Sequence, residues 1–253
     1  MKRLGFYLNP IASFRAESAS KEPDLSVIGG IASRYGVDPI IIGCHPQQKL
    51  VTERDLRLLK ELVVCDLYLL CPGSFSAVEN VMSTLKPQGV ILVSRHWDGG
   101  GTLLSLGDEL LGRGAITETK QAEEIGQIVS LGKETSTTVW AFVDPLPAQA
   151  RWWAKTGLYG AILNGKAFTS SSSTQEAHQA WESLNDAAVA FSKFGLVVGV
   201  MGGITLHHLT PLAKIPQIEE FYLEHSLPAT ALLIGLEKSI NLFLSTLTRS
   251  IQA

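Results

Sequence analysis

Short apolar runs bounded by Gly, Pro or polar residues recur along the whole chain and alternate with longer segments of helical period. Such runs are typical of parallel strands buried on both faces. We expect strands at Leu4–Asn9, Pro39–His45, Asp66–Pro72, Gly89–Ser94, Thr138–Asp144, Gly160–Asn164, Leu196–Met201 and Glu220–His225. Helices are expected at Asp24–Tyr35, Thr117–Leu131, Ala148–Thr156, Thr174–Phe194, Thr205–Ala213 and Ala229–Ile251.

Two further segments carry signals for helix starts. Thr52 and Asp55 fit a capping box, and Ser76 and Glu79 fit a second one. Helices are therefore expected after both boxes as well. The Ser-rich stretch Thr169–Thr174 predicts a loop that leads to a helix N-cap.

Eight strand–helix units in 253 residues match the size of a closed (β/α)8 barrel, which is typically about 250 residues. An open doubly wound sheet is the alternative, but no glycine-rich dinucleotide fingerprint follows the first strand. No composition shift or linker divides the chain. We therefore predict an α/β fold, a single TIM-barrel domain over residues 1–253, with functional side chains at the C-terminal ends of the strands.

Charge and hydropathy argue against two classes of partner. Lys and Arg total 21 while Asp and Glu total 24, so the net charge of −3 provides no basic surface for nucleic acid or membrane. The segment Ala229–Ile251 is apolar, but Glu237 and Lys238 interrupt it, which is typical of a packed helix rather than a membrane span. Asn9 and Pro10 break the apolar stretch near the N-terminus, so it does not fit a signal peptide.

The three cysteines are Cys44, Cys65 and Cys71, and they form no C-x-x-C pair. This pattern favours a reduced, cytoplasmic protein without a metal site. Cys44 and Cys71 end adjacent predicted strands, so they can form a redox or metal pair. Packing in the core is the commoner role of a free cysteine, and both interpretations stay open.

Three segments carry a resemblance to a known family: LGFYLNPIASFR, GVDPIIIGCHPQQKLVTERDLRLLKEL and FSKFGLVVGVMGGITLHHLTPLAKIPQIEEFYLEHS. In this order the chain resembles pyridoxine 5′-phosphate synthase from Leu4 to Leu247. The resemblance implies a barrel enzyme that condenses 1-deoxyxylulose 5-phosphate with aminoacetone phosphate and closes a pyridine ring. It also implies no metal or organic cofactor, a small-molecule substrate and a homo-oligomer.

Several positions that carry catalysis in the resembled family hold other residues here. Gly43, Ile162 and Gly202 fall on family acid/base positions, and none of them can exchange a proton near neutral pH. Glu224 replaces a family glycine that lies near bound phosphate, next to the matching His225. A carboxylate there repels a phosphate dianion unless Arg95 or Lys166 neutralises it. We therefore do not expect the parent reaction.

The candidate site comprises the residues that the barrel and the resemblance place at the mouth. The catalytic candidates are His45, Tyr68 and His225. The candidates for substrate binding are Tyr7, Asn9, Arg15, Arg95, Thr102, Asp144, Asn164, Gly202, Gly203 and Glu224. Tyr7 and Tyr68 are expected to enter the barrel mouth, where they can stack on a planar ligand or fill space.

Other candidates have two interpretations each. Asp144 can be a site carboxylate or a helix cap, and Lys166 can bind an anion or lie on the surface. Gly202 and Gly203 resemble the phosphate-binding turn of many barrels. The segment 95–102, with three glycines, can be a lid over the mouth or a solvated loop.

Three functional hypotheses follow. The first is a divergent, cofactor-independent enzyme of this family that condenses or ring-closes a small carbonyl or amine compound. The second is a catalytically inactive barrel that binds a metabolite or a partner subunit. The third is a true pyridoxine 5′-phosphate synthase.

Overall fold

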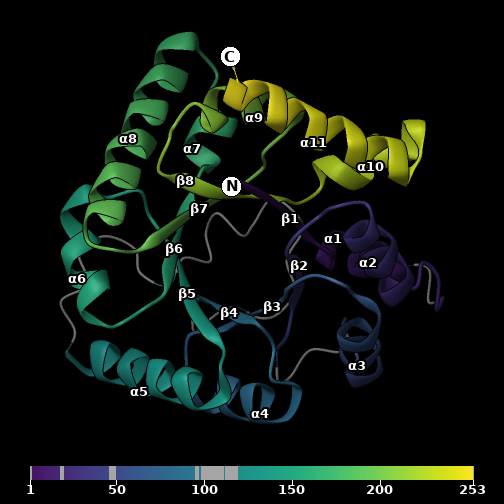
Figure 1. Ribbon diagram of the computed structural model, residues 1–253, viewed down its shortest axis with the longest axis horizontal. Helices are drawn as coiled ribbons and strands as arrows, with labels where there is room; N and C mark the ends of the chain where they lie inside the picture. The colour runs from purple at the N-terminus through teal and green to yellow at the C-terminus, as the bar shows by residue number, and fades with distance from the viewer. Residues whose placement is uncertain are drawn as a thin grey trace.

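The computed structural model describes residues 2–17, 20–45, 50–94, 97, 111 and 119–252. Eight parallel strands form one closed barrel in chain order, and β1 pairs with β8 to close it (Figure 1). The strands are β1 (Arg3–Tyr7), β2 (Ile40–Gly43), β3 (Leu67–Pro72), β4 (Gly89–Val93), β5 (Thr138–Val143), β6 (Gly160–Asn164), β7 (Val197–Met201) and β8 (Ile218–Leu223). The predicted TIM barrel is confirmed.

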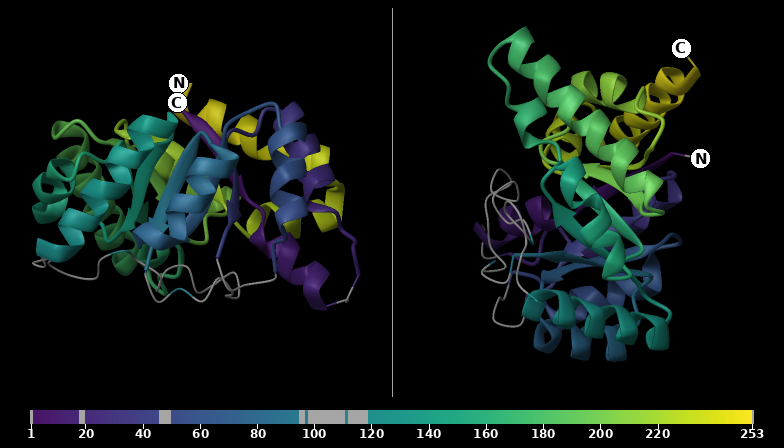
Figure 2. Two further views of the ribbon diagram at one scale, coloured as in Figure 1. Left: turned by 90° about the horizontal axis from the view of Figure 1, so that it is seen from below. Right: turned by 90° about the vertical axis from the view of Figure 1, so that its left-hand side faces the viewer.

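Helices surround the strands as an outer ring, and both termini lie at the end where the strands begin (Figures 1 and 2). The helices are α1 (Asn9–Glu17), α2 (Leu25–Arg34), α3 (Glu53–Leu62), α4 (Phe75–Leu85), α5 (Thr119–Thr135), α6 (Ala150–Lys155), α7 (Lys166–Thr169), α8 (Thr174–Lys193), α9 (Leu206–Ala213), α10 (Ser226–Ile234) and α11 (Leu236–Gln252), with a 3-10 turn η2 (Pro147–Gln149). No helix in the described part of the chain is long and apolar enough to cross a membrane.

Local sequence signals explain several helix starts. The Thr52–Asp55 capping box is confirmed at the start of α3. The second box is wrong, because α4 begins at Phe75, one residue before Ser76. At the start of α8, Ser173 accepts a hydrogen bond from a backbone N–H, as the Ser-rich stretch predicts.

Two helical regions differ from the prediction. The first strand ends at Tyr7, whereas the predicted strand ran to Asn9. Asn9 is instead the first residue of α1, and Pro10 is the second. Proline suits the first turn of a helix because it has no N–H that needs a partner there. The predicted C-terminal helix is two helices, α10 and α11, because Gly235 has a φ of 88° and interrupts it.

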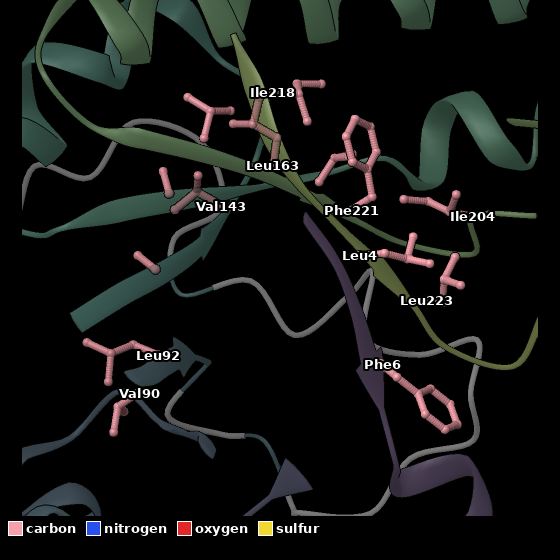
Figure 3. Packing of buried hydrophobic residues seen from close by; sticks show 14 of the residues in the cluster. Leu4, Phe6, Val90, Leu92, Val143, Leu163, Ile204, Ile218, Phe221 and Leu223 are labelled. Atoms are coloured by element: carbon pink, nitrogen blue, oxygen red, sulfur yellow. The ribbon is translucent and has the colours of Figure 1, made fainter. Parts of the chain in front are cut away.

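The barrel wall separates two apolar layers. Outward side chains of the strands pack under the helices together with Ile204, which follows β7. Figure 3 shows members of this cluster: Leu4, Phe6, Val90, Leu92, Val143, Leu163, Ile204, Ile218, Phe221 and Leu223. The inward side chains form a second buried cluster that fills the barrel: Tyr7, Ile41, Tyr68, Leu70, Ile91, Val93, Trp97, Trp140, Phe142, Ile162, Met201 and Tyr222. The interior is therefore a packed core, as in other barrels of this type.

Arg3 closes the barrel at the end where the strands begin. Its guanidinium lies 2.7 Å from Asp66 Oδ2, 3.2 Å from Asp38 Oδ2 and 2.5 Å from Glu220 Oε1. It also donates to the Tyr68 hydroxyl at 2.7 Å. The prediction that Tyr68 enters the mouth is therefore wrong.

The error at Tyr68 has a simple geometric reason. Tyr68 pairs with Gly89, the first residue of β4, so it lies at the start of the barrel wall. The inward residue two positions further along β3 is Leu70, which is buried in the interior cluster. A shift of two residues keeps a side chain on the same face but moves it about 7 Å along a strand.

Candidate functional site

The turn after β7 binds a carboxyl group of the same chain. Gly202 and Gly203 have φ values of 121° and 72°, which suit glycine, and their N–H groups point to one acceptor. Gly202 N donates to Glu224 Oε2 at 3.1 Å, and Gly203 N donates to the same oxygen at 2.6 Å. The predicted anion-binding turn thus holds the Glu224 side chain.

Burial controls the charge of Glu224. The residue is 1 % exposed, and burial raises the pKa of its carboxyl group to about 7, although the two backbone N–H groups and the Lys166 charge oppose this shift. A group with this pKa exchanges protons near neutral pH, which is the property that general acid–base catalysis requires. Lys166 is the first residue of α7. Its charge acts on Glu224, so it is not simply a surface lysine without a role near the turn.

Asn164, the last residue of β6, borders the same turn. Its Oδ1 accepts a hydrogen bond from Lys166 N at 3.0 Å. A Cβ at Gly202 would lie 3.1 Å from this Oδ1 and 2.9 Å from Lys166 N. The close approach of the two chain segments therefore requires glycine at position 202.

Two further polar side chains belong to this region: His225 lies near Gly203, and Tyr7 interacts with the charge of Glu224. His225 directly precedes α10, and its Nδ1 is buried without a hydrogen-bond partner among the described residues. Its Cε1 would lie 3.9 Å from a Cβ at Gly203. Burial, followed by the negative charge of Glu224, raises the pKa of Tyr7 well above its ordinary value. Glu224, His225 and Tyr7 are therefore the polar candidates around the Gly202–Gly203 turn.

The end of β2 forms a second part of the mouth. The Asn9 side chain accepts a hydrogen bond from Gly43 N at 2.7 Å. A Cβ at Gly43 would lie 2.4 Å from Asn9 Nδ2 and 2.8 Å from Trp97 Cη2, so these two side chains fill the space above the glycine. Trp97 is 2 % exposed, and the His45 ring stands perpendicular to it with 5.8 Å between the ring centres.

Two other candidates have different surroundings. Arg15 forms a paired contact with Asp55, at 2.9 Å and 2.8 Å, and donates to the Leu50 carbonyl at 3.0 Å. These contacts connect α1 to α3 and give no support to a role in substrate binding. Asp144 was predicted to be the last residue of the fifth strand, but β5 ends one residue earlier, at Val143. The N-cap of the next turn, η2, is Leu146, so Asp144 does not hold the predicted cap position.

Arg95, Thr102 and most of the predicted lid lie outside the described residues. Trp97 is the described residue of that segment, and it belongs to the barrel interior. Its burial was not anticipated, although a tryptophan beside three glycines is a signal that such a loop has an apolar anchor. Among the described residues, no cluster of three or more His, Cys, Asp or Glu side chains can hold a metal ion.

Solved structures with the same fold come from several enzyme families. Phosphoribosylanthranilate isomerase from Thermotoga maritima has a TM-score of 0.58 and 11% identity, with 98% of this chain and 99% of that chain covered. Thiamine phosphate pyrophosphorylase from Pyrococcus furiosus has a TM-score of 0.58 and 12% identity, with 99% and 96% covered. At such identities the likeness supports the fold alone.

Sequence comparison is more specific. A pyridoxine 5′-phosphate synthase of Synechococcus sp. (strain JA-2-3B'a(2-13)) is 26% identical over 243 residues, covering 95% of this chain and 96% of the relative. One of Prochlorococcus marinus (strain AS9601) is 26% identical over 249 residues, covering 98% and 99%. The family model described as pyridoxal phosphate biosynthesis protein PdxJ matches residues 4–249. Because this match spans nearly the whole chain, the protein belongs to the PdxJ family.

Proposed function

We propose that this barrel is a divergent PdxJ-family enzyme that acts on a small carbonyl or amine compound by condensation or ring closure, without the parent reaction. The observation that carries the proposal is the contact between the Glu224 carboxyl group and the N–H groups of Gly202 and Gly203. In many barrels such a turn binds phosphate. Here both donors already have an acidic partner, so the preferred ligand is neutral or cationic.

The proposed chemistry uses proton transfer at the mouth. Glu224, with a pKa of about 7, can take a proton from one ligand atom and return it to another. His225 presents a buried, unpartnered Nδ1 beside it in the described part of the chain, and imidazole is the side chain best suited to exchange protons near neutral pH. We assign His225 and His45 as further acid/base groups, with Tyr7, Asn9 and Asn164 positioning the ligand.

A catalytically inactive, ligand-binding barrel is the second candidate. Asn9 and Trp97 fill the space above Gly43, and the inward position on β6 holds the apolar Ile162. Gly43 and Ile162 fall on positions where the parent reaction needs groups that exchange protons. A barrel of this kind would bind the same neutral or cationic class of ligand without turning it over.

The first test measures the parent reaction. Purified protein, incubated with 1-deoxyxylulose 5-phosphate and aminoacetone phosphate, should form no pyridoxine 5′-phosphate, and its gene should not rescue a strain that lacks the synthase. Turnover near the enzyme median of about 10 s⁻¹ would instead identify a true synthase.

The second test separates the remaining candidates. Calorimetric titration should show tighter binding of 1-deoxyxylulose than of its 5-phosphate, and tighter binding of 1-amino-3-hydroxyacetone than of aminoacetone phosphate. Consumption of a bound compound, followed by NMR, supports the enzyme. Binding without consumption supports the inactive barrel, and preference for the phosphorylated forms contradicts both proposals about the mouth.

We also propose a homo-oligomer, as the resemblance implies. Leu232 and Leu233, near the end of α10, are 86% and 85% exposed in the single chain. Leucines this exposed are a common feature of protein interfaces. Light scattering should report a mass above that of one chain, and the variant with both leucines replaced by serine should be smaller. A monomeric native protein would contradict this proposal.

A further inference from the structure

Cys44 and Cys71 lie side by side on the outer face of the barrel wall. Gly43 pairs with Leu70, the last pair between β2 and β3, so the two cysteines are the next residues in register. The backbone agrees, because Cys44 N donates to the Leu70 carbonyl at 2.8 Å. The two side chains belong to the same cluster under the helices, on the face opposite to Gly43.

The spacing of adjacent strands suits a bond between these residues. Neighbouring strands lie about 4.8 Å apart, and disulfides join cysteines whose Cα atoms are about 4.4–6.8 Å apart. The thiols already interact. A hydrogen bond from Cys71 lowers the pKa of Cys44, although burial opposes it, whereas the contact with Cys44 and full burial raise the pKa of Cys71.

A groove on the surface leads to one of the two thiols. A cavity of about 370 Å³ lies between α3 and α4, and its lining includes Cys44, Leu56, Ala77 and Val81. Cys44 is partly exposed, while Cys71 behind it has no exposed surface. A small molecule in the groove can therefore reach the Cys44 sulfur first.

We propose that Cys44 and Cys71 are a redox-active pair that a hydroperoxide oxidises to an intramolecular disulfide. The Cys44 thiolate attacks the peroxide: an S–O bond forms, the O–O bond breaks, and the released oxygen leaves as alcohol or water after it takes a proton. The Cys71 sulfur then attacks the Cys44 sulfenic acid. An S–S bond forms, the S–O bond breaks, and the hydroxide leaves as water with the Cys71 proton.

Cys65 provides an internal control. It lies between α3 and β3, at the opposite end of the barrel wall, and its Sγ donates to the Asp66 carbonyl at 3.5 Å. Burial, together with the charges of Asp38 and Asp66, raises the pKa of this thiol to about 12. Because a thiol with this pKa is almost entirely protonated at neutral pH, Cys65 should react slowly with peroxide.

The experiment counts thiols in the folded full-length protein after treatment with a few equivalents of hydrogen peroxide. The protein starts with three free thiols, and one should remain. Alkylation followed by peptide mapping should identify a Cys44–Cys71 cross-link, which a small dithiol reverses. The Cys65→Ser variant should lose both of its thiols, and Cys71→Ala should accumulate a Cys44 sulfenic acid that dimedone traps.

Two results would overturn the proposal. One is the survival of all three thiols under conditions that oxidise free glutathione. The other is a disulfide that includes Cys65 or joins Cys44 of two chains. Mapping of the native protein decides between these outcomes even if a cysteine variant does not fold, because it needs no substitution.

Discussion

At the end of the barrel where the strands begin, the buried Glu220 carboxylate binds the guanidinium of Arg3. At the mouth, the described hydrogen-bond partners of the Glu224 carboxyl group are the peptide N–H groups of Gly202 and Gly203. Burial raises the pKa of both groups. The bonds from Tyr222 and Arg3 oppose this effect at Glu220, and the two backbone N–H groups and the Lys166 charge oppose it at Glu224. At Glu224 the pKa reaches about 7. A buried carboxyl group that is hydrogen-bonded to peptide N–H groups, and not to a guanidinium, keeps a proton that it can exchange near neutral pH.

This difference separates an end of the barrel that stabilises the fold from the end where we propose the chemistry. Asp38 and Asp66 of the Arg3 network precede β2 and β3, and Glu220 lies in β8, so the network holds the beginnings of several strands together. The mouth contains polar groups that stabilise the fold less, including the unpartnered Nδ1 of His225. Sites of this kind commonly give up stability for function.

The largest expected effect concerns ligand charge at the mouth. Two unit charges about 4 Å apart at an effective dielectric of about 20 repel by roughly 4 kcal/mol, which is close to a thousandfold in affinity. Glu224→Gly removes this charge and frees the N–H groups of Gly202 and Gly203. Above the pKa of about 7, the variant should bind 1-deoxyxylulose 5-phosphate up to about a thousandfold more tightly than the native protein does.

Calorimetric titration of both proteins measures this change, and unphosphorylated 1-deoxyxylulose is the matched control ligand. Its affinity should change much less, because it carries no charge for Glu224 to repel. If the native protein prefers the phosphorylated form and Glu224→Gly leaves that preference unchanged, the carboxyl group does not face the ligand.

The second effect tests the other end of the barrel. Arg3→Met leaves the buried Glu220 without its cation, so the free energy of unfolding should fall by about 3 kcal/mol. Arg57→Ala is the matched control, because its 3.2 Å pair with Glu53 is exposed on one helix and should contribute at most about 0.5 kcal/mol. Urea unfolding measures both values. A loss for Arg3→Met as small as the loss expected for Arg57→Ala would show that the Arg3 network is not a stabilising feature.

The third effect is a pH dependence of stability. The folded pKa of Glu224 is about 7 and its ordinary value is 4.5, so the folded state binds more protons than the unfolded state between these values. The contribution of the Glu224 carboxyl group to the free energy of unfolding is therefore fully present below pH 4.5, and it is lost as the pH rises through about 7. At about 1.4 kcal/mol per unit, the loss is about 3 kcal/mol.

Glu224→Gln should remove this part of the pH profile, because an amide oxygen can still accept from the same N–H groups but does not titrate here. Unfolding curves across the same pH range compare the two proteins. Parallel profiles would place the pKa of Glu224 near its ordinary value and would remove the basis for its role as an acid/base group.

The sequence predicts the barrel well because each buried strand is a short apolar run, and the structure moves the predicted ends by only a few residues. It predicts depth within the barrel less well. Tyr68 has the correct inward direction but lies at the wrong end, since alternation along a strand fixes the face and not the height. The helix that begins at Asn9 was missed because the preceding apolar run continues into it.

The contacts of the mouth could not be predicted from local signals. Gly202 and Glu224 are 22 residues apart and meet only because β7 and β8 are neighbours in the closed sheet. The sequence indicates both residues and the conflict between the Glu224 charge and a phosphate. It does not indicate that the carboxyl group binds the turn itself, since that depends on the side-chain geometry at the ends of two strands.

The smallest expected effect completes the comparison of the two ends. His225 directly precedes α10 without a side-chain cap bond, and its Nδ1 has no described partner, so His225→Leu removes no hydrogen bond of that atom. Replacing a buried polar group that lacks a partner with an apolar one is nearly neutral or stabilising. The free energy of unfolding should change by less than about 1 kcal/mol, far less than for Arg3→Met, while any turnover of a ligand at the mouth should fall. A loss of stability as large as that of Arg3→Met would mean that His225 supports the fold and is not a spare acid/base group beside Glu224.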